Sequence, residues 1–256
     1  MIKDAAGQSL RRILKSMKSV LIAYSGGVDS TFLLKSAADS LGSGVLAVTA
    51  RLPSVSEKEI CQAVSIAGKL KVRHMVVNVT LPQQFWRNSP DRCYFCKKAL
   101  CSRLAHIAAR KRIKYIADGT NADDCMDFRA GERALREAGV RSPLKEAGIS
   151  KNDVRRYSRG MRLVTWNLPA MACLASRVAY GERITPKKLV MINKAEELLR
   201  SLRFSLVRVR LHGSICRIEV KPEEISRILD FRAALVKQLK SIGFKYIALD
   251  IEGYRT

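Results

Sequence analysis

Val20-Leu-Ile-Ala-Tyr-Ser-Gly-Gly-Val-Asp-Ser30 is the stretch of sequence that decides the fold. Residues 20–24 are apolar or aromatic, which is typical of a strand buried on both faces of a parallel sheet. A polar loop with two consecutive glycines follows, and residues 30–40 have the composition of a helix. A strand, a glycine loop and a helix in this order turn backbone N–H groups and a helix N-terminus toward one point. The stretch therefore predicts an anion-binding turn.

The sequence on either side of this stretch alternates between strand and helix patterns. Short apolar runs predict strands over residues 19–24, 45–49, 73–79 and 113–117, and longer periodic runs predict helices over residues 9–17, 30–40, 56–70 and 94–112. This alternation is typical of an α/β fold, in which helices cover both faces of an open parallel sheet. Ligands bind such sheets at the carboxyl ends of the strands, where residues 25–30 and 118–124 both form polar loops.

The pattern changes twice toward the C-terminus. Residues 128–172 are rich in glycine and proline and predict loops and short helices over the site. Beyond residue 185, the sequence predicts a helix to residue 203, strands over 206–211 and 215–220, a helix over 222–240 and a strand over 246–249. We therefore expect a large domain over residues 1–184 and a small α+β domain over residues 185–256, which binds substrate or mediates self-association.

The composition restricts the class of protein. The chain has 256 residues, 47% of them hydrophobic, which is enough to bury a core. Its apolar runs are far shorter than the roughly 20 residues that span a bilayer, and its first residues lack a hydrophobic signal core. We expect a cytoplasmic protein without a membrane partner, whose seven cysteines are thiols or metal ligands.

The charge is strongly positive. The chain has 47 Lys and Arg against 23 Asp and Glu, a formal net charge of +24. Such a field attracts polyanions and phosphorylated metabolites, so nucleic acid stays a candidate partner. A solvated basic surface explains the scattered cations equally well.

The glycine loop carries the groups that a phosphate site needs. Gly26 and Gly27 permit close backbone approach, Ser25 and Ser30 add hydroxyl groups, and Asp29 is suited to orient the loop or to hold Mg²⁺. The loop lacks the lysine spacing of a Walker phosphate loop. A tight turn with Ser and Asp as helix caps is the structural alternative. Against it, the string resembles the PP-loop of the ATP pyrophosphatases, which cleave ATP between the α and β phosphates and adenylate a carbonyl or carboxylate.

Four further segments narrow this resemblance. Residues 118–124, 141–144, 169–185 and 207–213, in this order, resemble the LarE family over nearly the whole chain. LarE proteins are ATP-dependent sulfur transferases that act on pyridinium-3,5-biscarboxylic acid mononucleotide, a precursor of the nickel-pincer cofactor of lactate racemase. The resemblance implies a HUP-like fold and two chemical steps. AMP is placed on a pyridinium carboxylate, and a sulfur nucleophile then displaces AMP to leave a thiocarboxylate.

The same resemblance implies roles for individual residues. Asp29 and Cys173 are expected to be catalytic, with ATP and Mg²⁺ bound at the PP-loop. Further nucleotide contacts are implied at Ala50, Gly119 and Thr120. Substrate contacts are implied at Ser176, Arg177, Arg208 and Arg210. The last two alternate along a predicted strand and so project from one face, where they can clamp a phosphate or carboxylates, although a solvated strand face is the alternative.

The cysteines indicate where the sulfur comes from. Cys173 matches the position that, in some LarE proteins, gives up its own sulfur and becomes dehydroalanine. Cys93 and Cys96 begin a predicted helix, whose dipole favours the thiolate form. By resemblance to the cluster-dependent LarE proteins, these three cysteines would hold a 4Fe-4S cluster with one iron open to hydrosulfide. We favour this cluster over the sacrificial route.

The acidic residues and the cysteines also permit different roles. Asp123 or Asp124 would hold Mg²⁺ or cap the next turn. The Cys93/Cys96 pair would bind zinc with Cys101 or Cys125, form a redox pair, or simply be buried. We expect Cys61 and Cys216 to be core residues, because their neighbours are apolar.

The expected partners follow from this chemistry. They are the phosphorylated pyridinium mononucleotide, a sulfide donor and further copies of the chain in a homo-oligomer. A tRNA thiolase with the same ATP chemistry and cluster is the main rival, and the charge of +24 supports it. The sequence is also compatible with a non-catalytic nucleotide-binding module and with an ammonia-using synthetase.

Overall fold

The chain is divided into two compact units. The computed structural model describes residues 4–125, 129–169 and 172–255. The first unit comprises Met1–Pro82 and Asp91–Met171, and the second comprises Gln83–Pro90 and Ala172–Thr256. Residues 83–90 join the second unit because the Asn88 side-chain amide donates to the carbonyl oxygens of Ala179 (2.7 Å) and Glu182 (2.9 Å). These units divide the chain at 171/172, so the expected domain boundary at 184/185 stays a prediction.

The first unit is built on a four-stranded sheet. The strands are β1 (Val20–Ala23), β2 (Val45–Arg51), β3 (Arg73–Asn78) and β4 (Tyr115–Ala117), in the order β3-β2-β1-β4. All neighbouring strands are parallel, with Val20 level with Val45 on one side and with Tyr115 on the other. The predicted α/β class with an open parallel sheet is therefore confirmed.

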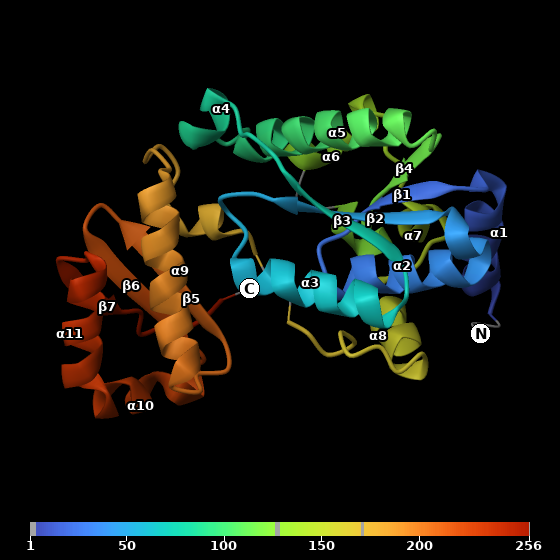
Figure 1. Ribbon diagram of the computed structural model, residues 1–256. Helices are drawn as coiled ribbons and strands as arrows, with labels where there is room; N and C mark the ends of the chain where they lie inside the picture. The colour runs from blue at the N-terminus through green and yellow to red at the C-terminus, as the bar shows by residue number, and fades with distance from the viewer. Residues whose placement is uncertain (1–3, 126–128, 170–171, 256) are drawn as a thin grey trace. The chain divides into compact units, whose positions relative to one another are not determined.

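Helices cover both faces of this sheet (Figure 1). On one face lie α1 (Ala5–Met17), α2 (Val28–Leu41), α3 (Glu57–Lys69) and α8 (Lys151–Gly160). The opposite face is covered by α5 (Arg92–Arg110), and α6 (Arg129–Glu137) lies beside it. The short segments η1 (Gly42–Gly44), η2 (Ala122–Cys125) and α7 (Pro143–Glu146) connect these elements. The glycine-rich region after residue 128 thus contains short helices, as predicted.

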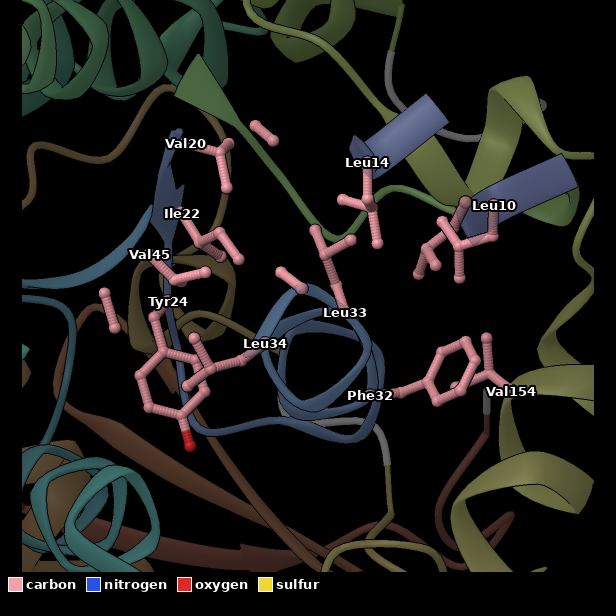
Figure 2. Packing of buried hydrophobic residues seen from close by; sticks show 14 of the residues in the cluster. Leu10, Leu14, Val20, Ile22, Tyr24, Phe32, Leu33, Leu34, Val45 and Val154 are labelled. Atoms are coloured by element: carbon pink, nitrogen blue, oxygen red, sulfur yellow. The ribbon is translucent and has the colours of Figure 1, made fainter. Parts of the chain in front are cut away.

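The central strand β1 anchors both hydrophobic layers. Val20 and Ile22 pack with residues of α1 and α2, whereas Leu21 packs against Leu104 of α5. Figure 2 shows the first layer, in which Phe32 of α2 faces Val154 of α8. Because successive strand residues point to opposite faces, a strand with an unbroken apolar run must be covered on both sides.

Two capping boxes fix where helices near the sheet edge begin. At the start of α3, the Glu59 N–H donates to Ser56 Oγ (3.2 Å), and the Ser56 N–H donates to the Glu59 carboxylate (2.7 Å). Ser150 and Asp153 form the same reciprocal pair at α8, with distances of 3.1 and 3.2 Å. Each pair satisfies two N–H groups that the helix itself leaves without partners.

The second unit is an α+β structure, as predicted. It contains α4 (Gln83–Trp86), η3 (Leu174–Arg177), α9 (Pro186–Ser201) and the strands β5 (Val207–His212), β6 (Ile215–Val220) and β7 (Tyr246–Leu249). The sheet order is β5-β6-β7, with an antiparallel first pair and a parallel second pair. Over both units, no helix among the described residues is long and apolar enough to cross a membrane.

The helix expected over residues 222–240 is not continuous. The chain forms η4 (Pro222–Glu224), α10 (Ile225–Asp230) and α11 (Arg232–Ile242), with a break at Phe231. The Phe231 ring meets Phe204 edge to face, with the ring centroids 6.1 Å apart. Packing of this aromatic side chain coincides with the break between the two helices, and the sequence periodicity did not reveal this break.

The cysteines outside the predicted site differ in exposure. Cys216 in β6 is completely buried, and burial raises its pKa to about 12. Cys101 in α5 is also buried, and burial raises the pKa of its thiol. Cys61 is exposed, so the expectation that it is a core residue is wrong. It follows Ile60 in α3 and lies beside the buried stripe of that helix, not on it. The side chain of Cys125 lies outside the described part of the structure.

These exposures predict the pattern of thiol reactivity. In the native protein at neutral pH, Cys61 and Cys173 should react with iodoacetamide, whereas Cys101 and Cys216 should be protected, because only an accessible thiolate is nucleophilic. Peptide mass spectrometry measures the labelling at each site, and denatured protein is the control in which all four react. Native labelling of Cys216 as fast as Cys61 would contradict the fold.

Candidate functional site

The loop after β1 forms a backbone cradle. Gly26 has a φ of +77°, and a Cβ added there would lie 3.0 Å from the Ala63 side chain, so only glycine fits without strain. The Ser25 and Ser30 hydroxyl oxygens lie 3.0 Å apart, and the Gly27 N–H donates to Ser25 Oγ at 3.3 Å. Gly27 is the N-cap of α2 and makes no side-chain cap hydrogen bond to the first N–H groups of the helix. The loop therefore presents N–H and O–H donors at a helix N-terminus, which suits a phosphate.

The loop after β4 packs directly on this cradle. A Cβ added to Gly119 would lie 2.9 Å from the Ser30 nitrogen and 3.0 Å from the Ser30 Cα. These are backbone atoms, so the contact requires glycine. β1 and β4 are neighbours at the point where the strand order reverses, which is where open α/β sheets bind ligands. The structure thus brings together the two loops that the sequence placed at this edge.

Asp29 is held between two partners in the first turn of α2. Its Oδ1 accepts from the Asn121 side-chain amide at 3.3 Å, and its Oδ2 forms an ion pair with Lys151. Lys151 is the first residue of α8, and sequence reasoning missed it. The capping sequence at Ser150 indicates where the helix begins, but a pairing across 122 positions leaves no local signal. A carboxylate and an ammonium group therefore lie together beside the phosphate cradle.

The polar residues of the β4 loop mainly stabilise the loop itself. Asp118 accepts from the Thr120 hydroxyl (2.6 Å) and from the Ser142 hydroxyl (2.7 Å). Asp124 accepts from the Asn121 N–H (2.9 Å), and Asp123 accepts from the Lys151 N–H (2.7 Å). Both aspartates thus accept from backbone N–H groups, Asp123 at the start of α8 and Asp124 within its own turn, whereas the sequence allowed for a cap on the turn that follows. The nucleotide contact of Thr120 and the identity of the Mg²⁺ ligand stay predictions.

A buried relay fixes the start of the PP-loop. The Thr49 hydroxyl donates to the Tyr24 carbonyl oxygen at 2.8 Å and lies 2.8 Å from His74 Nε2. Burial lowers the pKa of His74, so the imidazole is neutral at pH 7. Because the Thr49 hydroxyl hydrogen is donated to Tyr24, His74 Nε2 carries the hydrogen of the second bond and donates it to Thr49. Half-buried Ala50 follows in β2, beside this relay. The relay ties β1, β2 and β3 together at the edge where Ala50 is expected to contact the nucleotide.

Two of the three predicted cluster ligands lie in the first unit. Cys93 and Cys96 are half-buried near the start of α5, which begins at Arg92, two residues before the predicted start. Cys173 belongs to the second unit. Among the residues that the structure describes, no three His, Cys, Asp or Glu side chains are gathered as a metal site. The 4Fe-4S site therefore stays a prediction.

Cys173 is exposed on a short, tied turn. It precedes η3, and its carbonyl oxygen accepts from the Ser176 N–H (2.9 Å) and from the Ser176 hydroxyl (2.8 Å). The Arg177 guanidinium donates to the Ala172 carbonyl oxygen at 3.1 Å. These bonds hold the backbone on both sides of the thiol, so its sulfur is presented to solvent from a defined turn.

Arg177 points into the protein, although the sequence predicted a substrate contact. Its Nε lies 2.9 Å from Glu196 Oε1, and the two side chains are 6% and 1% exposed. The same carboxylate accepts from the Val209 N–H at 3.2 Å and pairs with Arg200. Arg177 thus links the Cys173 turn to α9 and β5. Its position supports a role in holding the thiol, and a direct substrate contact stays a prediction.

Arg208 and Arg210 lie on one face of β5, as the alternation predicted. The Glu219 carboxylate, 2% exposed, lies among three guanidinium groups, those of Arg208 (3.6 Å), Arg210 and Arg217 (2.9 Å). Arg217 also reaches Asp250 at 3.5 Å. Since Glu219 and Asp250 together carry one charge fewer than these three arginines, this face of the sheet keeps a net positive charge and is suited to an anionic substrate.

The Gly119 contact can be tested by a single methyl group. Gly119→Ala would force the β4 loop or α2 to shift. If ATP binds this loop, as the sequence predicts, the affinity for ATP should fall about tenfold or more, measured by calorimetry. Gly68→Ala in α3 is the matched control, because nothing lies within 4 Å of the added Cβ, and it should raise stability by up to about 1 kcal/mol. Unchanged ATP affinity in Gly119→Ala would show that the contact does not shape the site.

Arg177 and Arg200 both pair with the Glu196 carboxylate, but they should contribute differently to stability because only Arg177 is buried. Arg177→Ala removes a buried partner of Glu196 and should lower the free energy of unfolding by about 3 kcal/mol. Arg200→Ala removes a partner that is 42% exposed and should cost less than about 1 kcal/mol. Urea denaturation measures both variants, and equal losses would contradict this view of the Cys173 turn.

Comparison with known proteins places the chain in a family. No family model matches it. An uncharacterized protein of Synechocystis is 40% identical over 97% of this chain and 94% of its own length. The pyridinium-3,5-bisthiocarboxylic acid mononucleotide synthase of Lactiplantibacillus plantarum is 39% identical over 95% of this chain and 89% of its own length. An uncharacterized protein of Methanocaldococcus jannaschii is 30% identical over 93% of this chain and 92% of its own length. Because the identity to the Lactiplantibacillus synthase extends over nearly the whole chain, and so over both units, the chain belongs to the LarE family.

Proposed function

We propose that this protein is an ATP-dependent sulfur transferase. It converts a carboxylate of pyridinium-3,5-biscarboxylic acid mononucleotide into a thiocarboxylate for nickel-pincer cofactor synthesis. The similarity to the Lactiplantibacillus synthase, 39% over 95% of the chain, carries this proposal. The donor-lined loop at the strand-order reversal, the exposed Cys173 thiol and the positive face of β5 support it.

The first step is adenylation at the PP-loop. A substrate carboxylate oxygen attacks the α-phosphorus of ATP, the bond to the β-phosphate oxygen breaks, and pyrophosphate leaves. The N–H groups at the start of α2 and the hydroxyls of Ser25 and Ser30 bind the phosphates. Asp29 has the carboxylate oxygens that Mg²⁺ prefers, and the ion would add positive charge at the phosphates. On metal binding, Lys151 would be released from Asp29 and could then interact with the negative charge of the phosphates.

The second step is attack by sulfur. A thiolate adds to the acyl carbon of the adenylate and expels AMP, which is a far better leaving group than oxide. In the sacrificial route the thiolate is Cys173, and removal of its Cα proton then breaks its Cβ–S bond, leaving a thiocarboxylate and dehydroalanine. In the cluster route, Cys93, Cys96 and Cys173 would hold a 4Fe-4S group whose open iron supplies hydrosulfide. All three side chains are partly or fully exposed, as either route needs.

A cluster-dependent tRNA thiolase is the second candidate. The formal net charge of +24 is the observation that favours it, because tRNA binding rests on phosphate contacts. Both enzymes would form AMP, so the sulfur acceptor distinguishes them. Incubation with tRNA instead of the pyridinium nucleotide should give no thiolated product if the main proposal is right.

Product analysis tests the proposal. Anaerobically purified protein, incubated with ATP, the pyridinium biscarboxylate nucleotide and sulfide, should form AMP and a thiocarboxylate that mass spectrometry detects. Cys173→Ala should abolish the thiocarboxylate, because both routes need this sulfur. Cys61→Ala, which removes another exposed thiol, is the control and should keep the wild-type yield. ADP formation, or a full yield from Cys173→Ala, would contradict the proposal.

The protein after turnover reveals the source of the sulfur. About four irons per chain and an unchanged protein mass would indicate the cluster. Loss of the elements of hydrogen sulfide at Cys173 would instead establish the sacrificial route. Iron analysis before turnover and intact-protein mass spectrometry after it provide the two readouts.

A further inference from the structure

Exposed cations gather where the strands of the first unit begin. Lys18 precedes β1, Lys71 precedes β3, and Arg73 is the first residue of β3. The cations before β4 are Lys111, Arg112 and Lys114. All six are exposed. The connecting residues 18–19, 42–44, 70–72 and 111–114 contain no Asp or Glu. We call these six residues the strand-start edge. It lies at the end of the sheet opposite to the PP-loop, which follows the carboxyl end of β1.

The charge of the strand-start edge is uncompensated. Within the described ranges, none of its six cations forms an ion pair with a carboxylate, whereas other cations of the same unit, such as Lys35 and Arg51, do. Lys114 contacts a ring, with its Nζ 5.5 Å from the Tyr115 centroid, and Arg73 donates to the Ser43 carbonyl oxygen. Uncompensated cations on a single edge produce a local positive potential that attracts polyanions.

Three of these cations occupy a backbone conformation that favours glycine. Lys18, Lys71 and Arg112 have φ values of 59°, 54° and 54°. The equivalent turn before β2 uses Gly42, with a φ of 53°. A side chain in this region is strained, and glycine is the residue that removes the strain. Arg162 and Arg203 have similar φ values elsewhere in the chain, so this conformation is not confined to the edge. Among the described residues, the strand-start turns are where three such cations lie at one end of a single sheet.

The edge also has a shape that suits a phosphate chain. A hollow of about 370 Å³ is lined by Arg73, Lys111 and Arg112, and its other lining residues include Ser19, Gly44 and the apolar residues Leu46 and Met75. Arg73 belongs to β3 and Arg112 precedes β4, the two outer strands of the sheet. Three inter-strand spacings of about 4.8 Å separate these strands by roughly 14 Å. The cations therefore flank the hollow over a distance that spans several phosphates of a polynucleotide.

The chemistry of the edge favours one class of partner. None of the large exposed hydrophobic side chains that the structure describes lies in the strand-start turns. Protein interfaces have an apolar or aromatic centre, and membrane-bound surfaces insert apolar side chains. Interfaces with nucleic acid are instead polar and strongly positive. We propose that the strand-start edge binds the phosphodiester backbone of nucleic acid without reading its bases. This activity goes beyond sulfur transfer and does not depend on the small-molecule substrate.

Fluorescence anisotropy with the full chain tests this binding. The probes are a labelled mixed-sequence RNA duplex and a DNA duplex of the same sequence, each titrated over a series of salt concentrations. The edge variant is Lys18→Gly/Lys71→Gly/Arg112→Gly. The control variant is Arg203→Gly/Lys237→Gln/Lys240→Gln, which also removes three cations and includes one residue with a φ of 63°, in the second unit.

The expected result is specific to the edge. The edge variant should bind at least one duplex more than tenfold more weakly than wild type at low salt. In a plot of log affinity against log salt concentration, the magnitude of its slope should be smaller by about 2–3, as the loss of three phosphate contacts predicts. The control variant should stay within about twofold of wild type. The thermal midpoint of the edge variant should be unchanged or higher, because glycine removes the strained conformations.

Several outcomes would overturn the proposal. Equal weakening in both variants would show that binding follows net charge and not this edge. Tighter binding to phosphatidylserine vesicles or to polyglutamate than to either duplex would assign the edge to another class of partner. If the glycine variant is destabilised, Arg73→Gln/Lys111→Gln/Lys114→Gln removes three edge cations without changing the strained residues, and wild-type affinity in that variant would refute the proposal.

Discussion

The close approach of Gly119 to Ser30 is the constraint on which the first unit depends. β1 and β4 are adjacent and parallel, so the loops that follow them meet at one edge, and the backbone of one loop touches the first turn of α2. A side chain at position 119 would separate them. With the loops in contact, Asn121 reaches Asp29, and α8 begins where Lys151 can pair with the same carboxylate. The sheet, two loops and two helices are thereby combined at one edge, where the predicted anion site lies.

A buried carboxylate has the corresponding role in the second unit. Glu196 carries its charge in a place with almost no solvent, which is costly unless every lone pair finds a partner. Arg177, Arg200 and the Val209 N–H supply those partners. Because Arg177 also binds the backbone beside Cys173, the same network that neutralises the carboxylate fixes the turn that presents the thiol.

Periodicity and loop chemistry were enough to predict most of the fold. The strands over 20–23 and 73–78, the mixed C-terminal sheet and the PP-loop follow from short apolar runs and glycine placement. Contacts between distant residues were not predictable. The Asp29–Lys151 pair, the inward direction of Arg177 and the helix break at Phe231 all depend on side chains that meet only in the folded chain. Cys61 was misplaced because apolar neighbours in sequence do not show which face of α3 is buried.

Exchange of labelled pyrophosphate into ATP is the most direct measure of chemistry at the Ser25–Ser30 loop. Reversible adenylation of a pyridinium carboxylate predicts that label enters ATP when the biscarboxylate nucleotide is present and sulfur donors are absent. The exchange should require the pyridinium biscarboxylate nucleotide but no sulfur donor, since adenylation precedes sulfur transfer. An absence of exchange, together with release of inorganic phosphate and ADP, would show that ATP is cleaved between the β and γ phosphates. That result would contradict adenylation as the function of this site.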